Sequence, residues 1–363
     1  MSKQITKIVI TGGPCAGKST AMSWIQEVFT KKGYHVLFVP ETATELMTGG
    51  FAPWDFSDPA DFQRILMRLQ RWKEESFGEA AQRMPDERVL VVCDRALLDN
   101  KAYMTPEVFA EVLHQLNADE YAMRDSYDAV FHLITAAKGA EQFYTMANNK
   151  ARYESVADAV AIDDKIMASW TGHPHLRVID NTTEFSEKMK RLIAEISSFL
   201  GEPGPYEMKR KFLIEYPDIA YLESLPNCSK VEIIQTYLKS ADDSEVRIRQ
   251  RGLKGHYIYT KTIKRKVVPK KRIETETRLT QDEYLNMLID ADTTLRQIRK
   301  TRYCLTCGHH CFELDIYGFW TEQAIMCIEL HDENEPIDFP PFIKVIREVT
   351  GDDNYTNFAM AHR

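Results

Sequence analysis

The residues with the clearest chemistry lie near the start of the chain, where residues 12–20 match the pattern G-x-x-x-x-G-K-[ST]. Glycines at this spacing let the backbone wrap a phosphate, and a helix that begins here points its first N–H groups at the anion. Lys18 is expected to reach the β- and γ-phosphates, and the Ser19 hydroxyl to bind Mg²⁺ or Mn²⁺. We predict that ATP or GTP binds to Gly12, Gly13, Pro14, Cys15, Ala16, Gly17, Lys18, Ser19 and Thr20.

Three charged residues follow predicted strands. In a parallel sheet, ligands bind at the carboxyl ends of the strands, so these residues are candidates for the site. Asp94 is the expected ligand of the divalent cation, because it directly follows an apolar strand. Glu41 is expected to accept a proton from a substrate hydroxyl or from water, and Arg95 to hold a second substrate. Each residue also has a plainer interpretation as a helix cap or a solvated loop residue.

A charged segment at 148–154 follows the fourth predicted strand, where nucleoside and nucleotide kinases carry a lid. Arg152 in this segment is a candidate for neutralising the charge on a transferred phosphoryl group. The chain has no Asn-Lys-x-Asp motif after that strand, so the choice between adenine and guanine stays open. The predicted catalytic residues are Lys18, Glu41, Asp94 and Arg152.

In the second half, charged residues occupy every second position of several segments. Because alternate residues of a strand point to the same face, each segment predicts a strand with one charged face. Several such strands favour a barrel with a polar, phosphate-binding interior over an ordinary solvated sheet face. The predicted ligands of a phosphate or headgroup are Lys209, Lys211, Arg247, Arg249, Lys264, Arg272, Lys300 and Arg302.

The elements that must position these groups follow two patterns. In the first half, apolar runs alternate with helical patterns, which predicts a parallel, doubly wound α/β sheet. The runs lie at 7–11, 35–39, 88–93, 129–134 and 176–179. After a segment rich in glycine and proline the period changes to two, which predicts an antiparallel β-barrel. We predict a P-loop domain over 1–200, a linker over 201–206 and a barrel domain over 207–363.

The overall composition narrows the classes of partner. A formal net charge of −8 over 363 residues argues against nucleic acid. The seven cysteines, an odd number, suit a reducing compartment better than a disulfide framework. No apolar run is long enough for a membrane span, and Met1 leads straight into the first strand without room for a signal peptide. We expect a cytoplasmic protein that is recruited to membranes only peripherally.

Residues 1–200 resemble the AAA-like P-loop domains related to ribosylnicotinamide kinases. The resemblance depends on residues 12–20, Glu41, the pair Asp94-Arg95, Arg152 and the run 173–176. It implies a nucleotide-binding fold and keeps kinase activity open.

Residues 205–363 resemble the CYTH domains, which have the triphosphate tunnel metalloenzyme fold. The matching stretches are 206–214, 246–249, 272–276, 300–303, 312–315, 328–330 and 348–352. The resemblance implies a Mg²⁺ or Mn²⁺ site, and the matching carboxylates are Glu207, Glu274, Glu276, Glu313, Asp315 and Glu329.

Two positions depart from the CYTH pattern. Lys209 replaces the second glutamate of the E-x-E-x-K opening, and Cys327 replaces the first glutamate of a late E-x-E. Exchanging a carboxylate for an ammonium disfavours a cation and favours an anion. We therefore expect this domain to bind a polyphosphate or a phosphoinositide headgroup rather than to cleave triphosphate efficiently.

The order of the two halves resembles that of the photoreceptor translocation-defect proteins, which implies nucleotide binding, phosphoinositide binding and a role in membrane traffic. Two hypotheses follow. The first is a regulatory protein in which a slowly hydrolysed nucleotide controls headgroup binding. The second is a bifunctional enzyme, a small-molecule kinase fused to a metal-dependent triphosphatase.

Two further patterns each allow two interpretations. Cys304, Cys307 and Cys311 fit either a zinc site or a hairpin that turns at Gly308. The basic run at 264–272 fits either a nuclear-import or membrane-facing patch, or the wall of the barrel with an exposed turn. We favour the hairpin for the cysteine segment, and the barrel wall with an exposed turn for the basic run.

Overall fold

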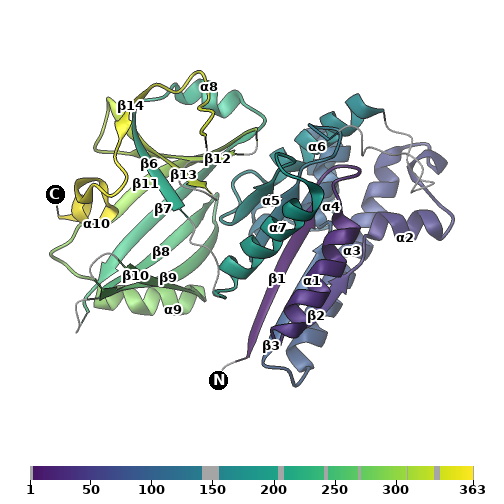
Figure 1. Ribbon diagram of the computed structural model, residues 1–363, viewed down its shortest axis with the longest axis horizontal. Coiled ribbons are helices and arrows are strands. Elements are labelled where there is room, and N and C mark those ends of the chain that lie inside the picture. Colours follow the sequence, from purple (N-terminus) through teal and green to yellow (C-terminus); the bar gives the residue numbers. More distant parts are fainter. Residues whose placement is uncertain are drawn as a thin grey trace. The chain divides into compact units, whose positions relative to one another are not determined.

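The computed structural model describes residues 3–140, 155–202, 208–240, 244–268, 271–308, 310–330 and 336–362. The chain divides into two compact units, Met1–Glu207 and Met208–Arg363. Within the described residues, the first unit contains a five-stranded parallel sheet and the second a nine-stranded antiparallel sheet (Figure 1). The predicted fold class, an α/β P-loop domain followed by an antiparallel, barrel-like sheet, is confirmed.

The parallel sheet has the order β2-β3-β1-β4-β5, so that β1 is central. Its strands are β1 (Gln4–Thr11), β2 (His35–Val39), β3 (Arg88–Asp94), β4 (Ala129–Leu133) and β5 (Leu176–Ile179). The connecting helices are α1 (Lys18–Lys31), α2 (Thr42–Thr48), η1 (Pro53–Asp55), α3 (Pro59–Arg83), η2 (Leu97–Tyr103), α4 (Pro106–Gln115), α5 (Glu120–Asp125), α6 (Val156–Trp170) and α7 (Phe185–Phe199). The register places Ile10 beside Asp94, and Thr11 beside His132. The loop after β1 therefore begins beside the ends of β3 and β4.

Alternate residues of these strands pack against different layers. Ile8 and Ile10 of β1, with Leu90 of β3, belong to the core cluster that contains buried residues of α1 and α7. Val9 and Val91 are buried as well, although their side chains point to the other face. A sheet buried on both faces explains the unbroken apolar runs of its strands.

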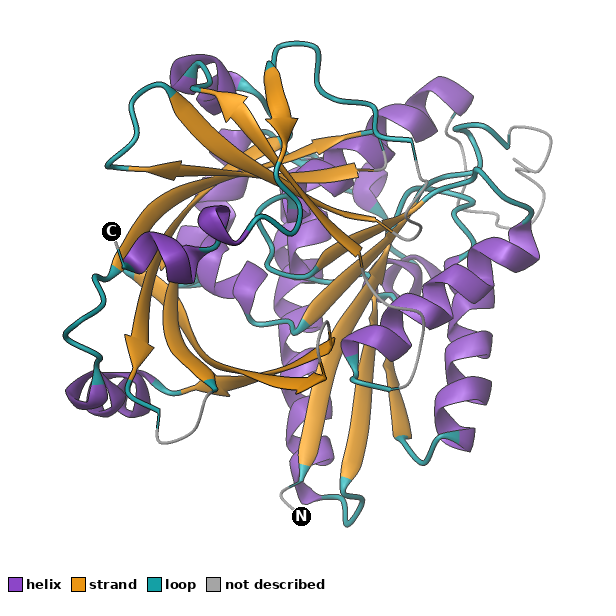
Figure 2. Cartoon of the chain, turned by 60° about the vertical axis from the view of Figure 1, so that its left-hand side comes forward, coloured by secondary structure: helices purple, strands orange, loops and turns teal. Residues whose placement is uncertain are grey.

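The antiparallel sheet has the order β10-β9-β8-β7-β11-β12-β13-β6-β14 and curls toward itself (Figure 2). Its strands are β6 (Met208–Glu215), β7 (Cys228–Leu238), β8 (Glu245–Leu253), β9 (His256–Val268), β10 (Lys271–Leu279), β11 (Ile298–Cys307), β12 (His310–Tyr317), β13 (Gln323–Leu330) and β14 (Val345–Glu348). Its helical segments are α8 (Ile219–Ser224), α9 (Gln281–Met287), η4 (Leu288–Asp290), η5 (Asp353–Tyr355) and α10 (Asn357–Ala361).

The two faces of this sheet differ in chemistry. One face carries an apolar cluster that includes Phe212, Phe312, Leu314 and Met326. The opposite face carries the charged rows and is called the polar face below; its members include Lys209, Arg249, Arg302 and Asp315. A second apolar cluster with Tyr237, Ile298, Tyr317 and Met360 of α10 covers part of the polar face. The period-two pattern of the sequence thus corresponds to two distinct faces.

The cysteine-containing segment forms a hairpin. Strand β11 ends at Cys307, β12 begins at His310, and Gly308 lies between them with a φ of 61°. Cys304 pairs with Glu313 in the register of the two strands. Among the described residues, no group of three or more His, Cys, Asp and Glu side chains is arranged to hold a metal ion.

No helix in the described part of the chain has both the length and the apolar character needed to cross a membrane.

Candidate functional site

The phosphate-binding loop connects β1 to α1, as the motif requires. Gly12 has a φ of 136°, and a Cβ at this position would lie 2.0 Å from the carbonyl oxygen of Leu133. Gly17 has a φ of 95° and directly precedes α1. Both positions therefore require glycine. The first turn of α1 leaves its N–H groups without intrahelical partners, and these groups are the donors that a phosphate needs.

The Lys18 ammonium lies within the loop. Its Nζ donates hydrogen bonds to the carbonyl oxygens of Gly12 and Gly13, each at 3.0 Å. Burial lowers the pKa of Lys18 to about 8, and the positive charge of Arg95 acts in the same direction. An anion bound beside Lys18 would stabilise its charged form and raise its pKa again.

Glu41 and Arg95 form an ion pair at the carboxyl ends of β2 and β3. Arg95 Nε lies 2.6 Å from Glu41 Oε1, and the Thr44 hydroxyl donates to Glu41 Oε2 at 2.7 Å. Burial opposes ionisation of Glu41, but the charges of Arg95 and Lys18 hold its pKa below the usual value. Arg95 has a φ of 60°, which is uncommon for a residue with a side chain and is typical of functional sites. Glu41 is therefore ionised at neutral pH.

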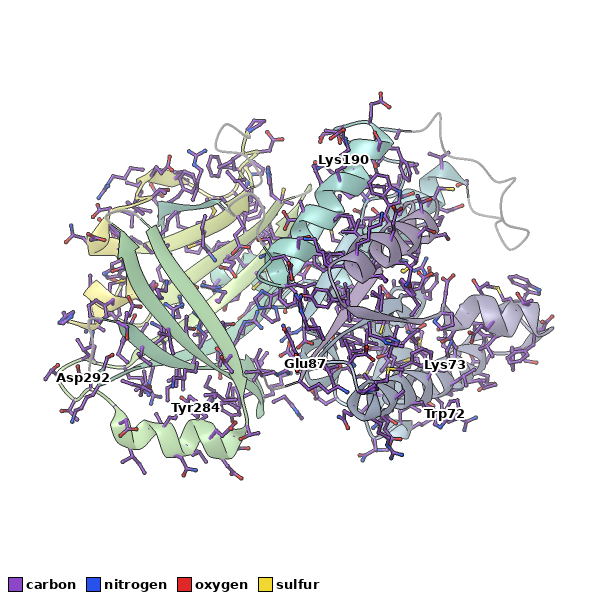
Figure 3. The ribbon with its side chains drawn as sticks, turned by 60° about the horizontal axis from the view of Figure 1, so that its bottom comes forward. Trp72, Lys73, Glu87, Lys190, Tyr284 and Asp292 are labelled. Carbon is purple, nitrogen blue, oxygen red and sulfur yellow. The ribbon has the colours of Figure 1, made fainter. Side chains whose placement is uncertain are left out.

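Lys73 of α3 holds the segment around Glu41 in place. Its buried Nζ donates to the Pro40 carbonyl oxygen at 2.8 Å and to Glu45 Oε2 at 2.6 Å. The neighbouring Trp72 is 64% exposed and makes no such contribution (Figure 3). Sequence reasoning missed this role, because Lys73 is one of several charged residues on a long helix.

Asp94 is the last residue of β3 and lies on the same edge of the sheet. Its Oδ1 is buried and has no hydrogen-bond partner among the described residues. Burial raises the pKa of Asp94 to about 6, against the opposing effect of Lys18. A buried carboxylate oxygen without a partner, together with the Ser19 hydroxyl in the same cavity, fits the oxygen ligands that Mg²⁺ prefers.

These groups line one cavity of about 1090 Å³ in the first unit. Its phosphate end contains residues 14–20 of the loop, with Asp94 and Arg95. Its other end is mainly apolar and aromatic, and is lined by Met47, Trp54, Phe62, Leu66 and Tyr103. Gln63 also lines the cavity; it is 7% exposed, and its Oε1 has no hydrogen-bond partner in the described part of the chain. The cavity therefore has room for a second molecule beyond the phosphates.

The predicted lid residue Arg152, together with the rest of segment 141–154, lies outside the described residues. Its role therefore stays a prediction.

On the polar face, three of the carboxylates that the CYTH resemblance implicated in metal binding are paired with cations. Arg302 binds Asp315 through two parallel hydrogen bonds of 2.7 and 2.9 Å. Lys300 donates a further hydrogen bond to Asp315. Lys209 Nζ lies 2.8 Å from Glu329 and 3.6 Å from Glu313. These carboxylates raise the pKa of Lys209, although burial opposes them. Lys209 therefore supplies the positive charge in this part of the face.

Arginines dominate a neighbouring part of the polar face. Arg249 lies 3.9 Å from Glu276, and its Nε has no hydrogen-bond partner among the described residues. Burial lowers the pKa of Arg249 to about 10, and the neighbouring charge of Arg247 contributes. A buried arginine and a half-buried arginine, two positions apart on β8, favour a bound anion.

The other predicted ligands of this unit have different positions. Lys211 Nζ donates to the carbonyl oxygen of Tyr355 at 3.3 Å. Lys264 is opposite Glu245 on β8 and Glu274 on β10. The side chains of Arg272 and Glu274, and all of Glu207, lie outside the described parts of the structure.

Comparisons with known proteins match parts of the chain. A model of the AAA domain family matches residues 7–188. No curated protein matches the chain. Among solved structures, the inorganic triphosphatase NE1496 is 27% identical over 44% of this chain and 95% of its own, with a TM-score of 0.32. The PH1012 protein from Pyrococcus horikoshii OT3 is 17% identical over 36% of this chain and 80% of its own, with a TM-score of 0.27.

The parallel sheet, the loop with its two constrained glycines and the Lys18–Asp94 edge define a P-loop nucleotide-binding domain. The chain belongs to the AAA domain family.

Proposed function

We propose that the first unit transfers the γ-phosphoryl group of ATP or GTP to a hydroxyl group of a small molecule. The observation that carries this proposal is the second end of the cavity, next to the Glu41–Arg95 pair. A protein that only hydrolyses nucleotide needs room for a water molecule. An apolar, aromatic end with a buried amide oxygen that has no hydrogen-bond partner among the described residues instead suits an organic acceptor.

The residues have distinct roles in this reaction. The loop N–H groups and Lys18 bind and orient the phosphates. Glu41 takes the proton of the acceptor hydroxyl. At the same time the hydroxyl oxygen of the acceptor bonds to the γ-phosphorus, and the bond from that phosphorus to the β–γ bridging oxygen breaks. Arg95 orients Glu41 through their ion pair. Asp94 and Ser19 would hold Mg²⁺, which neutralises charge on the phosphates when bound.

The test is acceptor-dependent product formation by the full chain. MgATP or MgGTP is incubated with panels of nucleosides, sugars and polyols, and phosphorylated products are identified by mass spectrometry. We expect one acceptor class to stimulate nucleoside diphosphate release, and Glu41→Gln to abolish the stimulation. Slow hydrolysis that no acceptor accelerates, and that Glu41→Gln leaves unchanged, would instead support the regulatory hypothesis.

We also propose that the polar face of the second unit binds an anionic polyphosphate or a phosphoinositide headgroup without cleaving it efficiently. The supporting observation is the Arg247–Arg249 pair beside carboxylates that Lys209, Lys300 and Arg302 already neutralise. Headgroup binding would recruit the protein peripherally to a membrane surface.

This second proposal is tested in a Lys18→Ala background, which removes the nucleotide site. Inorganic triphosphate and soluble inositol phosphates are titrated with Mg²⁺ and with a chelator, and vesicles with and without phosphoinositide are compared. Binding that persists in chelator, with little phosphate release, supports the proposal. Fast Mg²⁺-dependent phosphate release would overturn it in favour of a triphosphatase.

A further inference from the structure

A buried carboxylate outside the sequence motif is bonded to the phosphate-binding loop. Asp163 lies on α6, and its side chain is fully buried. Its Oδ1 accepts hydrogen bonds from the N–H of Gly13 at 2.7 Å and from the N–H of Thr135 at 3.3 Å. His132 Nε2 lies 3.1 Å from the same oxygen, and Lys138 Nζ donates to Oδ2 at 2.8 Å.

This contact explains why a glycine occupies position 13, where the motif accepts any residue. Gly13 does not have a positive φ, so its backbone conformation does not demand glycine. A Cβ at Gly13 would, however, lie 2.9 Å from the Cβ and the Oδ1 of Asp163. The side chain of Asp163 therefore occupies the space that a larger residue at position 13 would need.

The same carboxylate reaches the wall of the cavity. Thr135 and Lys138 belong to the segment after β4, in which Ala136, Gly139 and Ala140 line the cavity. The Thr135 hydroxyl also donates to the Pro14 carbonyl oxygen of the loop. Asp163 thus joins the start of the loop to the adjacent wall.

Asp163 is ionised at neutral pH, because His132 and Lys138 lower its pKa more than burial raises it. A charged acceptor makes the bond from the Gly13 N–H stronger than a neutral one would. On the other side of the loop, Lys188 Nζ donates to the carbonyl oxygens of Ala16 at 3.1 Å and Ile134 at 2.7 Å. A buried carboxylate and a buried lysine therefore hold two different points of the loop.

We propose that Asp163 is a positioning residue that holds the phosphate-binding loop in its nucleotide-binding shape through the Gly13 N–H. This rests on the nucleotide-binding part of the proposed function and not on the acceptor. If the chain binds nucleotide but transfers no phosphate, the proposed role of Asp163 still holds.

The test measures the dissociation constants of MgATP and MgGTP for the full chain, without acceptor. Asp163→Ala is compared with Asp164→Ala. Asp164 also pairs with Lys138, at 2.7 Å, but its side chain is 58% exposed and, within the described part of the chain, forms no hydrogen bond with the loop. Loss of a charge-assisted hydrogen bond predicts about 10-fold weaker binding for Asp163→Ala. We expect Asp164→Ala to bind as wild type does.

Two more variants separate positioning from general stability. Asp163→Asn keeps an acceptor oxygen and should recover part of the affinity. Gly13→Ala should weaken binding by pushing against Asp163, and adding Asp163→Ala should relieve that effect, so that the double variant binds no more weakly than Asp163→Ala alone. If Asp163→Ala does not fold, Asp163→Asn and Gly13→Ala carry the test. Wild-type affinity in Asp163→Ala, or equal losses in Asp163→Ala and Asp164→Ala, or wild-type affinity in Gly13→Ala, would overturn the proposal.

Discussion

Lys18 in the first unit and Lys209 in the second have the same side chain, but their surroundings shift its pKa in opposite directions. Burial and Arg95 lower the pKa of Lys18 to about 8. Glu329 and Glu313 raise the pKa of Lys209 despite burial. The charge of Lys18 is therefore incompletely compensated within the protein, whereas that of Lys209 is already paired.

The difference shows that a row of cations is not by itself a strong anion site. The phosphate-binding loop uses fixed main-chain donors and one lysine that gains from a bound phosphate. The polar face surrounds most of its cations with carboxylates, which a ligand must displace or accommodate. On this face the Arg247–Arg249 pair is the better candidate for an anion, because burial and mutual repulsion lower the pKa of Arg249 to about 10.

The largest expected effect comes from removing the lysine of the loop. Lys18→Ala should reduce nucleotide turnover about 10³-fold, since it removes a charge that stabilises the transferred phosphoryl group. Triphosphate binding by the second unit should not change. The measurements are nucleoside diphosphate release and a triphosphate titration. Lys31→Ala is the control, because Lys31 is on the same helix and its side chain is 72% exposed. If Lys18→Ala reduced nucleotide turnover and triphosphate binding equally, the two sites would not be independent.

Asp94 should give the next largest effect. Because the pKa of Asp94 is about 6 in the folded protein, activity should fall as the pH drops through 6 and the carboxylate is protonated. Asp94→Asn should lower turnover about 100-fold above pH 6, and its difference from wild type should shrink below pH 6, where the wild-type carboxylate is protonated as well.

The same variant should be more stable than wild type at pH 8. The pKa of Asp94 is higher in the folded than in the unfolded state, so ionisation of Asp94 costs stability as the pH rises from about 4 to about 6. Removing that cost should stabilise Asp94→Asn by about 2 kcal/mol above pH 6, and the gain should vanish near pH 4. Thermal unfolding at several pH values tests this, and a gain that is constant with pH would contradict it.

Lys209→Glu tests the polar face directly. The change brings a third carboxylate beside Glu313 and Glu329 and removes the cation of Glu329, while Arg302 still pairs with Glu313 at 2.5 Å. We expect triphosphate binding in chelator to weaken about tenfold, and Mg²⁺ or Mn²⁺ to restore it. Lys209→Gln, which removes the cation without adding a carboxylate, should not gain metal dependence. Isothermal titration with and without metal tests this, and metal-independent binding in Lys209→Glu would count against the account of the polar face.

Arg249→Ala should have the smallest effect. We expect about fivefold weaker binding of triphosphate, because Arg247 stays in place. Arg299→Ala is the matched control, since Arg299 is exposed and adjacent to the buried Lys300 on β11. Equal effects of the two variants would show that the anion binds through general surface charge.

Much of the fold could be predicted from local pattern. The apolar runs identified the five parallel strands, because a strand buried on both faces is apolar throughout. The alternating charges identified the polar strands of the second unit, because side chains of a strand alternate between two faces. The motif at residues 12–20 also predicted the phosphate-binding loop, since few other sequences adopt that turn.

Contacts between distant residues could not be read in this way. Asp163 lies 150 positions from Gly13, and Lys73 lies 33 positions from Pro40. Each is an ordinary charged residue on a helix until the fold buries it against a specific partner. The apolar end of the cavity likewise combines side chains from α2, η1, α3 and η2.

The alternation of residues, the position of the loop and the charged strands could therefore be predicted from the sequence, because they depend on spacing along the chain. Which charges are paired is visible only in the three-dimensional structure. Pairing depends on the distances between strands and helices that the sequence separates, and those distances fix the opposite pKa shifts of Lys18 and Lys209.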